Sequence, residues 1–235
     1  MNNSMKVYSN SWLNIKFSTF CQVSNKKLPD KKFYDEFYKT AFKKYKSIDN
    51  FPSYWLEEKK IDSIDLNEII KKNKFKNVLS LASGLGVVEN NLSKLNPELN
   101  IYCNDLSDFV SWNFNNSSRV KHINLDDYFD FDFDIIYVNG LDYALNDHDY
   151  MFFLTQLSRF KSKLIMISCV VFPENLSPKN KIGHFLKGLF GWQFWGKLRS
   201  EKLHLNFFKE SNLEVLKKGK TSSIEANFFL LKKND

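Results

Sequence analysis

The chain contains little cysteine and little arginine. Its 235 residues include three cysteines, Cys21, Cys103 and Cys169. An odd number of widely separated cysteines argues against a disulfide framework, so we expect a reducing, cytoplasmic setting. Only three of the 34 basic residues are arginines. Because lysine commonly serves to solvate a surface, the net charge of +7 is weak support for nucleic-acid binding.

Long apolar runs are also missing. The longest nearly apolar run, Leu164–Phe172, is shorter than the roughly 18 residues needed to cross a bilayer, so we expect no transmembrane segment. Residues 1–11 are polar and contain no apolar stretch of signal-peptide length, so no export signal is expected. Hydrophobic residues still make up 43% of the chain, which is enough for a sizeable globular core.

The hydrophobic pattern changes near residue 76. Before it, apolar residues recur at helical spacing, which predicts an N-terminal helical cap over residues 1–75. After it, short apolar runs alternate with amphipathic segments, which predicts a mostly parallel sheet with helices on both faces over residues 76–235. The five strands expected first are Asn77–Ala82, Asn100–Asn104, Val120–Asn124, Asp134–Asn139 and Lys163–Val171.

The end of the chain shows a different pattern. Leu213–Lys218 and Glu225–Leu231 are strand-like, and the residues between them are too few for a helix. Such a pair is expected to form an antiparallel hairpin. The predicted fold class is therefore α/β, with a seven-stranded, mostly parallel sheet whose last strand is antiparallel.

A glycine-containing turn follows the first expected strand. In the segment Val78–Glu89, VLSLASGLGVVE, Gly84 and Gly86 allow a sharp turn and a close approach of the backbone to a ligand. The amides of a helix that starts there favour an anionic or polar group. Asp105 ends the second strand, where a carboxylate can accept hydrogen bonds from ribose hydroxyls. Together these features predict a nucleotide-type cofactor.

Several other cofactor and catalytic motifs are absent. Glu89 stands where a dinucleotide fingerprint has its third glycine, which disfavours NAD and FAD. No Gly-Lys-Ser/Thr follows the loop, which excludes a P-loop, and no Gly-x-Ser-x-Gly marks a hydrolase nucleophile. The histidines show no paired ligand spacing with the cysteines, so no catalytic metal is expected.

With these features, residues 76–235 resemble the class I, Rossmann-like S-adenosylmethionine (SAM)-dependent methyltransferases. The resemblance rests on Ser83–Gly86, Asp105, Leu125–Asp127, Asn139–Tyr143 and the final hairpin. It implies an enzyme with SAM as cofactor, whose methionine part lies on the loop backbone and whose ribose is bound by the acid after the second strand. The implied cofactor-binding residues are Ser83, Gly84, Gly86, Asp105, Leu106, Leu125, Asp126 and Asn139.

One position departs from the family pattern. The family usually opens its first motif with an acidic residue, and Ala82 stands there in this chain. Either Glu89 or Asp142 compensates for it, or the affinity for the cofactor is reduced.

The loop after the fourth strand offers the catalytic candidates Asp142, Tyr143 and His148. Methyl transfer needs an aligned nucleophile and, for a hydroxyl acceptor, a group that takes the proton. Asp142 or His148 could be that base, although His148 fits a solvated loop histidine equally well. Asn139–Asp142 lacks the Asn/Asp-Pro-Pro-Tyr typical of amide and exocyclic amine methylation. We therefore expect metal-free O-methylation of a small molecule or glycan.

Residues 173–206 combine four of the eight glycines with many aromatic residues. Glycine reduces helical order and aromatic side chains cover apolar surface, so this composition predicts a movable cap over a substrate pocket. A core-packing helix and a membrane-surface helix are the alternatives. The buried stripe of the core-packing alternative would be Ile182, Phe185, Leu186 and Leu189. The candidate substrate contacts are His184, Trp192, Trp195 and Arg199.

Charged residues near this segment bear on the charge of the acceptor, and two alternative functions remain open. Lys187, Lys197 and Arg199 favour an anionic acceptor over a neutral one. The overall lysine excess keeps an RNA methyltransferase open, which would need a contiguous basic face. Ala82 keeps open a non-catalytic, methyltransferase-like partner or scaffold protein. Nothing in the sequence sets the oligomeric state.

Overall fold

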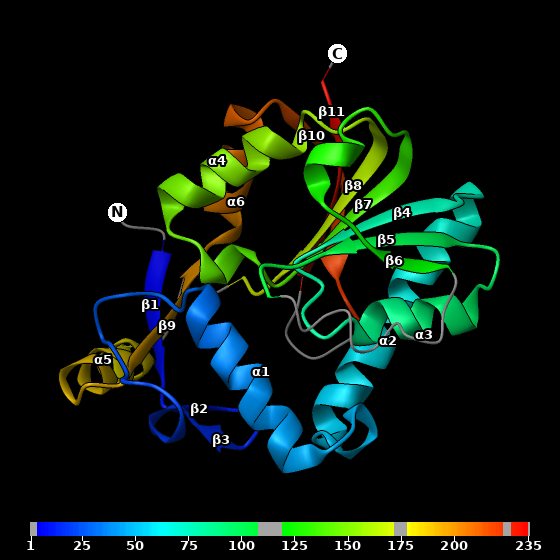
Figure 1. Ribbon diagram of the computed structural model, residues 1–235. Coiled ribbons are helices and arrows are strands. Elements are labelled where there is room, and N and C mark those ends of the chain that lie inside the picture. Colours follow the sequence, from blue (N-terminus) through cyan, green and yellow to red (C-terminus); the bar gives the residue numbers. More distant parts are fainter. Residues whose placement is uncertain (1–3, 108–118, 172–177, 223–226, 235) are drawn as a thin grey trace.

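A seven-stranded sheet forms the centre of the molecule (Figure 1). The computed structural model describes residues 4–107, 119–171, 178–222 and 227–234. The strands of the sheet are β4 (Asn77–Leu81), β5 (Asn100–Asn104), β6 (Val120–His122), β7 (Phe133–Asn139), β8 (Ser162–Cys169), β10 (Leu213–Lys220) and β11 (Asn227–Lys233). Their order is β10-β11-β8-β7-β4-β5-β6, and β11 is antiparallel to both of its neighbours. This arrangement confirms the predicted fold class.

The first five strands of the sheet begin and end within two residues of their predicted positions. In the final hairpin, residues 225 and 226 of the predicted last strand lie outside the described residues. The central strands β4 and β7 are buried on both faces, as expected for parallel strands covered by helices. Their near-continuous apolar sequences, which do not alternate with polar residues, were therefore sufficient to predict them as strands.

Helices cover both faces of the sheet. On one face, Leu66 and Ile70 of α2 (Ser53–Asn73) share a core with Val88 and Leu92 of α3 (Val87–Leu95) and with the strands. On the other face, Leu154 of α4 (Asp147–Leu157) packs in a second core. That core also contains a side chain of α6 (Glu201–Glu210). Helices thus lie on both faces, as predicted.

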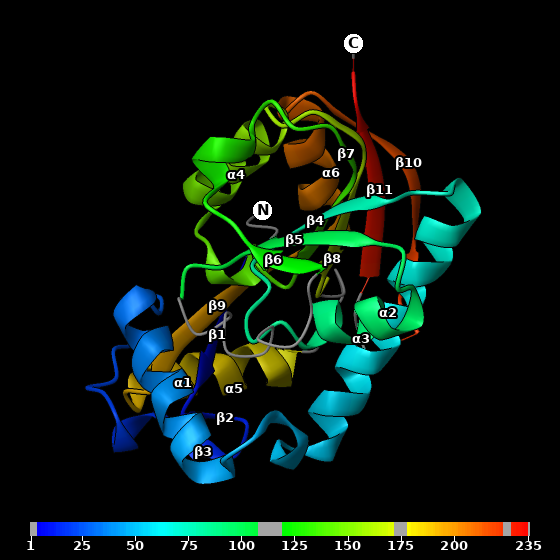
Figure 2. The ribbon, with the colours of Figure 1, turned by 45° about the vertical axis from the view of Figure 1, so that its right-hand side comes forward.

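The N-terminal region contains strands that the helical pattern did not predict. Besides α1 (Lys31–Tyr45) and α2, the structure has β1 (Ser4–Ser9), β2 (Ser11–Trp12) and β3 (Ile15–Lys16). β1 pairs antiparallel with β9 (Gln193–Arg199), from the other end of the chain. In Figure 2, β1, β9 and α1 lie together below the central strands. An aromatic third core joins α1 to β2 and β3. Short 3-10 helices occur at η1 (Phe17–Thr19), η2 (Ile48–Asn50), η4 (Leu125–Tyr128) and η5 (Asp142–Ala144).

The segment predicted as a movable aromatic cap folds mainly into α5 (Pro178–Leu189), β9 and the start of α6. Its residues 173–177 lie outside the described residues. Residues 193–199 are held as a strand by β1, so they form part of the fixed framework. The core-packing alternative for α5 is wrong, because its expected buried stripe is exposed: Ile182 is 57% and Phe185 65% accessible. The helix packs against β1 through its other face.

Candidate functional site

Two adjoining cavities lie beyond the carboxyl ends of β4, β5 and β7. The α2 cavity, of about 280 Å³, lies between the glycine loop and Trp55, Glu58 and Asp62 of α2. The β5 cavity, of about 440 Å³, lies beside Asp105 at the end of β5. Residues that line both cavities are Tyr38, Ala82, Gly84, Asn139, Gly140 and Tyr143. An elongated ligand can therefore occupy both while crossing the glycine loop.

The glycine loop has the strained backbone that its sequence implies. Ala82, Gly84 and Gly86 all have positive φ, at 56°, 59° and 66°. Glycine adopts this region freely, whereas an alanine there carries a strain of about 1–2 kcal/mol. Gly86 caps α3 without a side-chain hydrogen bond. The start of α3, whose Val87 and Val88 line the α2 cavity, therefore has no side-chain cap that would compete with a polar ligand group.

Asp105 links the loop to the β5 cavity. Its Oδ2 accepts a hydrogen bond from the Gly84 amide at 2.8 Å, and its Oδ1 accepts one from the Ser107 amide at 2.9 Å. Burial raises the pKa of Asp105, and these two amide bonds oppose that rise. A carboxylate has about four acceptor sites, so Asp105 keeps acceptor capacity for ligand hydroxyls. Leu106 and Leu125 line the same cavity and give it an apolar wall.

The α2 cavity is more strongly charged. Lys59 Nζ lies 3.1 Å from Asp62 Oδ2, and the Asn139 side-chain amide donates to the same oxygen at 2.9 Å. Glu89 accepts a hydrogen bond from the Ser80 hydroxyl at 2.5 Å. Burial raises the pKa of Glu89 to about 7. Its second oxygen, Oε2, is buried and has no hydrogen-bond partner among the described residues.

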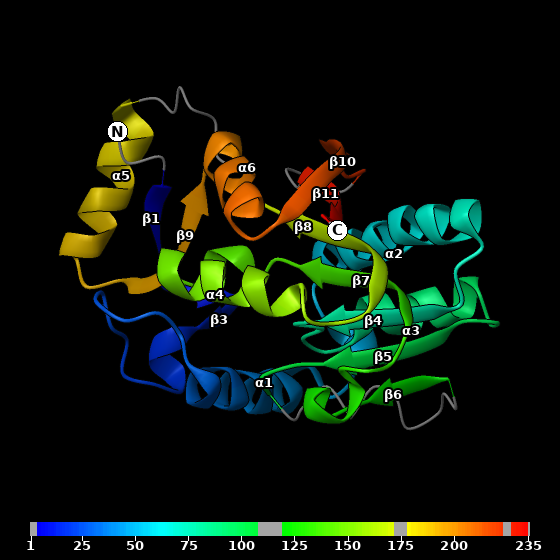
Figure 3. The ribbon, with the colours of Figure 1, turned by 90° about the horizontal axis from the view of Figure 1, so that it is seen from above.

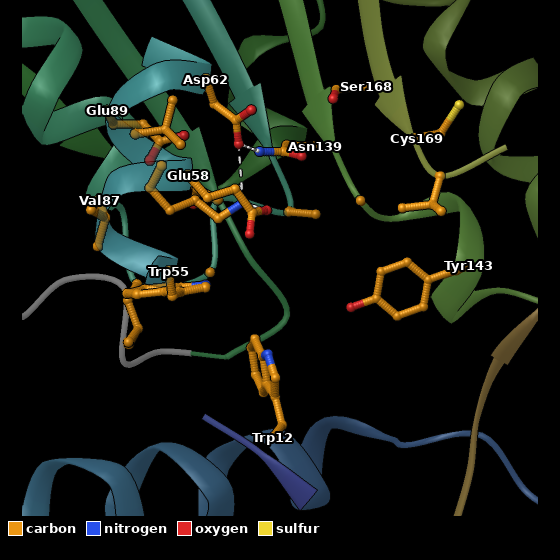
Figure 4. Close-up of a pocket in the computed structure, with 18 of the residues that line it drawn as sticks. Trp12, Trp55, Glu58, Asp62, Val87, Glu89, Asn139, Tyr143, Ser168 and Cys169 are labelled. Atoms are coloured by element: carbon orange, nitrogen blue, oxygen red, sulfur yellow. Dashed lines mark hydrogen bonds and ion pairs between the residues drawn. The ribbon is translucent and has the colours of Figure 1, made fainter. Parts of the chain in front are cut away.

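Figure 4 shows how these groups face the α2 cavity. Glu58 and Asp62 of α2 lie on one side, and Tyr143 points its hydroxyl inward from the opposite side. Burial raises the pKa of Tyr143 well above its usual range, so it stays a neutral donor. Of the two groups proposed to compensate for Ala82, Glu89 lines the cavity and Asp142 does not.

Asp142 belongs to a separate, closed network. Its side chain is buried against His204, with 3.6 Å between Oδ2 and Nε2, and lines neither cavity. Burial raises the pKa of Asp142 to about 7 and lowers that of His204 to about 3. The predicted catalytic role of Asp142 is at odds with this position. His148, with a side chain that is 91% accessible, lies exposed at the start of α4 and also lines neither cavity.

Arg199 is part of the same closed network. It is completely buried and donates to the backbone carbonyl oxygens of Asp142 and Leu145, while its Nε donates to Asp147 at 3.0 Å. Lys197 donates to Asp147 as well, at 2.6 Å. These bonds hold Arg199 inside the protein, which is at odds with its predicted contact with an acceptor.

The remaining predicted residues divide between the site and the periphery. Trp195 packs against Phe17 in the N-terminal aromatic core, with its ring 6.3 Å from that of Tyr143, so it supports the cavity from behind. Trp192 and His184 belong to the α5 end of the molecule, away from both cavities. Asp126 is exposed beside Leu125 and lines neither cavity.

The α2 residues were missed at the sequence level. Trp55, Glu58, Lys59 and Asp62 recur at spacings of three and four, which places them on one helix face. A face with several charges is usually solvated, so the pattern alone gave no reason to assign it to a site. The proximity of His204 and Cys169 to Asp142 was also missed. The fold brings these three residues together, although they are far apart in the sequence.

No family model matches the sequence, and no curated protein matches it. Solved structures do share its fold. A mitomycin 7-O-methyltransferase superposes with a TM-score of 0.61 at 12% identity, over 86% of this chain and 57% of that one. The magnesium protoporphyrin IX methyltransferase of Synechocystis PCC 6803, with bound SAH, gives 0.62 at 11% identity, over 87% of this chain and 97% of that one. An O-methyltransferase family 2 protein of Planctomyces limnophilus, in complex with apigenin, gives 0.52 at 15% identity, over 68% and 51%.

These similarities concern the fold. This chain spans little more than half the length of the mitomycin and Planctomyces proteins, and the sequence identities are low. The chain has the fold of the class I SAM-dependent methyltransferases.

Proposed function

We propose that this chain is a SAM-dependent methyltransferase that methylates an oxygen atom of a small acceptor molecule. The observation that carries the proposal is the pair of cavities that meet at the glycine loop, with Asp105 bonded to that loop on one side and a charged pair on the other. This division matches a ligand with a nucleoside at one end and an amino acid at the other.

The β5 cavity suits the nucleoside end. Asp105 accepts from the ribose hydroxyls, and the purine ring lies against the apolar side chains of Leu106, Leu125 and Phe153. This assignment agrees with the family resemblance, which implies that Asp105 binds the ribose and that Leu125 is a cofactor-binding residue.

The α2 cavity suits the methionine end. An amino acid carries an ammonium and a carboxylate group, and Asp62 and Lys59 offer the complementary charges 3.1 Å apart. Glu89 Oε2 is a buried acceptor without a partner among the described residues, so a cationic group satisfies it. The residues present therefore fit SAM, with Glu89 and Asp62 at the ammonium and Lys59 at the carboxylate.

The rest of the α2 cavity is left for the acceptor. Trp12, Tyr54 and Trp55 supply aromatic faces against which a planar or sugar ring can stack. When bound, SAM would supply a methyl group on a sulfonium sulfur, and neutral SAH would be the thioether that leaves. Tyr143 orients the acceptor oxygen, and Glu58 accepts its proton.

The charges around the site bear on which acceptors are compatible with it. Lys197 and Arg199 are engaged with Asp147, and the α2 cavity contains more carboxylates than lysines. We therefore favour a neutral hydroxylated acceptor over an anionic one.

Isothermal titration calorimetry with S-adenosylhomocysteine (SAH) tests the cofactor assignment. The chain is expected to bind SAH, and Asp105→Ala to weaken binding by about 10–100-fold, because charge-assisted hydrogen bonds contribute roughly 1.5–3 kcal/mol. Asp126→Ala is the matched control, since Asp126 is an exposed carboxylate next to the same cavity. The proposal fails if millimolar SAH does not bind, or if both variants lose affinity equally.

Labelled SAM separates this function from the two alternatives. A small-molecule enzyme transfers the label to a low-mass product from a cell extract. An RNA methyltransferase labels RNA and binds it with strong salt dependence. A non-catalytic partner protein transfers no label at all.

A further inference from the structure

Helix α5 presents an unusual apolar stripe to solvent. Among the described residues, five exposed large hydrophobic side chains lie on this helix or directly after it. They are Ile182, Phe185, Leu186, Leu189 and Phe190, with accessibilities of 57%, 65%, 42%, 66% and 78%. Their spacing of three and four residues places them on one continuous face. Single exposed apolar residues are ordinary, but a contiguous patch marks an interaction surface.

The opposite face of α5 is fixed to the protein. A Cβ atom on Gly188 would lie 2.8 Å from the Tyr8 ring of β1, so the helix approaches that strand closely. The Asn25 side chain donates to the Gly188 carbonyl at 3.0 Å. Since the glycine side packs inward, the large apolar side chains are directed outward. Figure 3 shows α5 on the outer side of β1 and β9, far from the central strands β4 and β5.

The charged residues of α5 itself are all basic. The sequence of α5 contains three lysines and no acidic residue. The loop that contacts Gly188 adds the exposed lysines Lys26 and Lys27. A second copy of this chain would bring the same positive charges against them, which costs energy. A surface with negative charges complements both the lysines and the stripe.

The length of α5 indicates how such a surface is bound. The helix has 12 residues, fewer than the roughly 20 that span a bilayer. Across the described part of the chain, no helix is both long and apolar enough to span a membrane. A short helix with an apolar face and flanking lysines is typical of segments that lie in the interface of an anionic bilayer.

We propose that α5 docks this protein on an anionic lipid surface. Phe185 and Leu189 enter the boundary between headgroups and acyl chains, and the lysines lie at the lipid phosphates. The proposal does not depend on methyl transfer, because α5 lies outside both cavities.

Vesicle flotation of the full chain tests it. Binding is expected with phosphatidylcholine vesicles that contain about one third phosphatidylglycerol, with little on phosphatidylcholine alone and a decrease at high salt. The double variant Phe185→Asp, Leu189→Asp is expected to reduce the bound fraction at least about tenfold. Phe152→Asp is the matched control, because Phe152 is 62% accessible on α4. Its vesicle binding is expected to stay unchanged.

Thermal unfolding and light scattering complete the test. Both variants are expected to keep the Tm of the parent chain, because the replaced side chains are exposed. The proposal is overturned if the full chain does not bind anionic vesicles, or if Phe152→Asp loses as much binding as the double variant. It is also overturned if the chain is a dimer that only the double variant dissociates, which assigns the stripe to a second copy. SAH titration is a separate readout, so a failed cofactor assignment leaves this test intact.

Discussion

Two networks of buried charged groups each include an acidic residue that follows a strand of the central sheet, and they differ in what they face. The first joins Asp105 to the Gly84 amide and opens on two cavities. The second joins Arg199 to the Asp142 carbonyl, with His204 packed beside that residue, and is closed to solvent. Both contain residue types expected in an active site. The difference teaches that access to a cavity, and not charge near a strand end, separates a ligand site from a structural network.

The closed network nevertheless contributes to the site. Arg199 fixes the backbone of η5, the segment that contains Tyr143. A Cβ atom on Gly196 would lie 2.6 Å from the Tyr143 ring, so β9 also packs tightly against this residue. The closed network therefore positions Tyr143, a side chain that lines both cavities.

The largest expected effect comes from breaking the closed network. Arg199→Met leaves two carbonyl oxygens and the Asp147 carboxylate without their buried cation, so it is expected to lower the free energy of unfolding by about 3–5 kcal/mol. Lys197→Met is the control, because Lys197 pairs with the same Asp147 from a partly accessible position and is expected to cost about 1 kcal/mol or less. Urea unfolding measures both. If Arg199→Met is as stable as the parent chain but has lost acceptor binding, Arg199 is a substrate contact and not a structural residue.

A second prediction distinguishes the ligand end bound in the α2 cavity from the end bound in the β5 cavity. Asp62→Asn removes the charge assigned to the ligand ammonium, so SAH affinity is expected to fall about tenfold, or about 1.4 kcal/mol. Adenosine has no amino acid end, so its affinity is expected to stay the same. Glu57→Gln is the control, because Glu57 is an exposed carboxylate on the same helix. If adenosine binding falls as much as SAH binding, Asp62 acts on the whole fold and not on one end of the ligand.

These two networks also show what the sequence could predict. The glycine loop, Asp105 and Leu125 form a local pattern of a strand, a turn and an acid at fixed spacing, and the structure places them around one cavity. The final hairpin followed from the short connection between two apolar runs. In each case, the arrangement follows from elements that succeed one another along the chain.

The missed features all depend on contacts between distant segments. β1 was not predicted because its partner strand, β9, lies almost 190 residues further along the chain. Arg199 was predicted as an acceptor contact because nothing in the sequence shows that its hydrogen-bond acceptors come from the loop after β7. Asp62 reaches the site only because α2 packs beside the glycine loop. A sequence pattern contains no direct sign of such contacts.

The prediction with the smallest expected effect compares two buried carboxyl groups. Glu89 lines the α2 cavity, and Asp142 belongs to the closed network. Burial raises the pKa of Glu89 and of Asp142 to about 7, from ordinary values of 4.5 and 3.8. Because the folded pKa is the higher one, each protonated carboxyl favours the folded state. That contribution is fully present below the ordinary pKa and is lost as the pH rises towards about 7. Glu89→Gln and Asp142→Asn are both expected to flatten the fall in unfolding free energy over this range.

Ligand binding then separates the two groups. If the ligand ammonium pairs with ionised Glu89, SAH affinity rises several-fold from about pH 6 to about pH 8 in the parent chain, because the carboxylate is already formed at the higher pH. Asp142→Asn keeps this rise, since Asp142 lines neither cavity. Glu89→Gln abolishes it, because the amide does not titrate. Calorimetry across this pH range measures all three proteins, and a rise that disappears in Asp142→Asn but persists in Glu89→Gln would reverse the assignment of the open and closed networks.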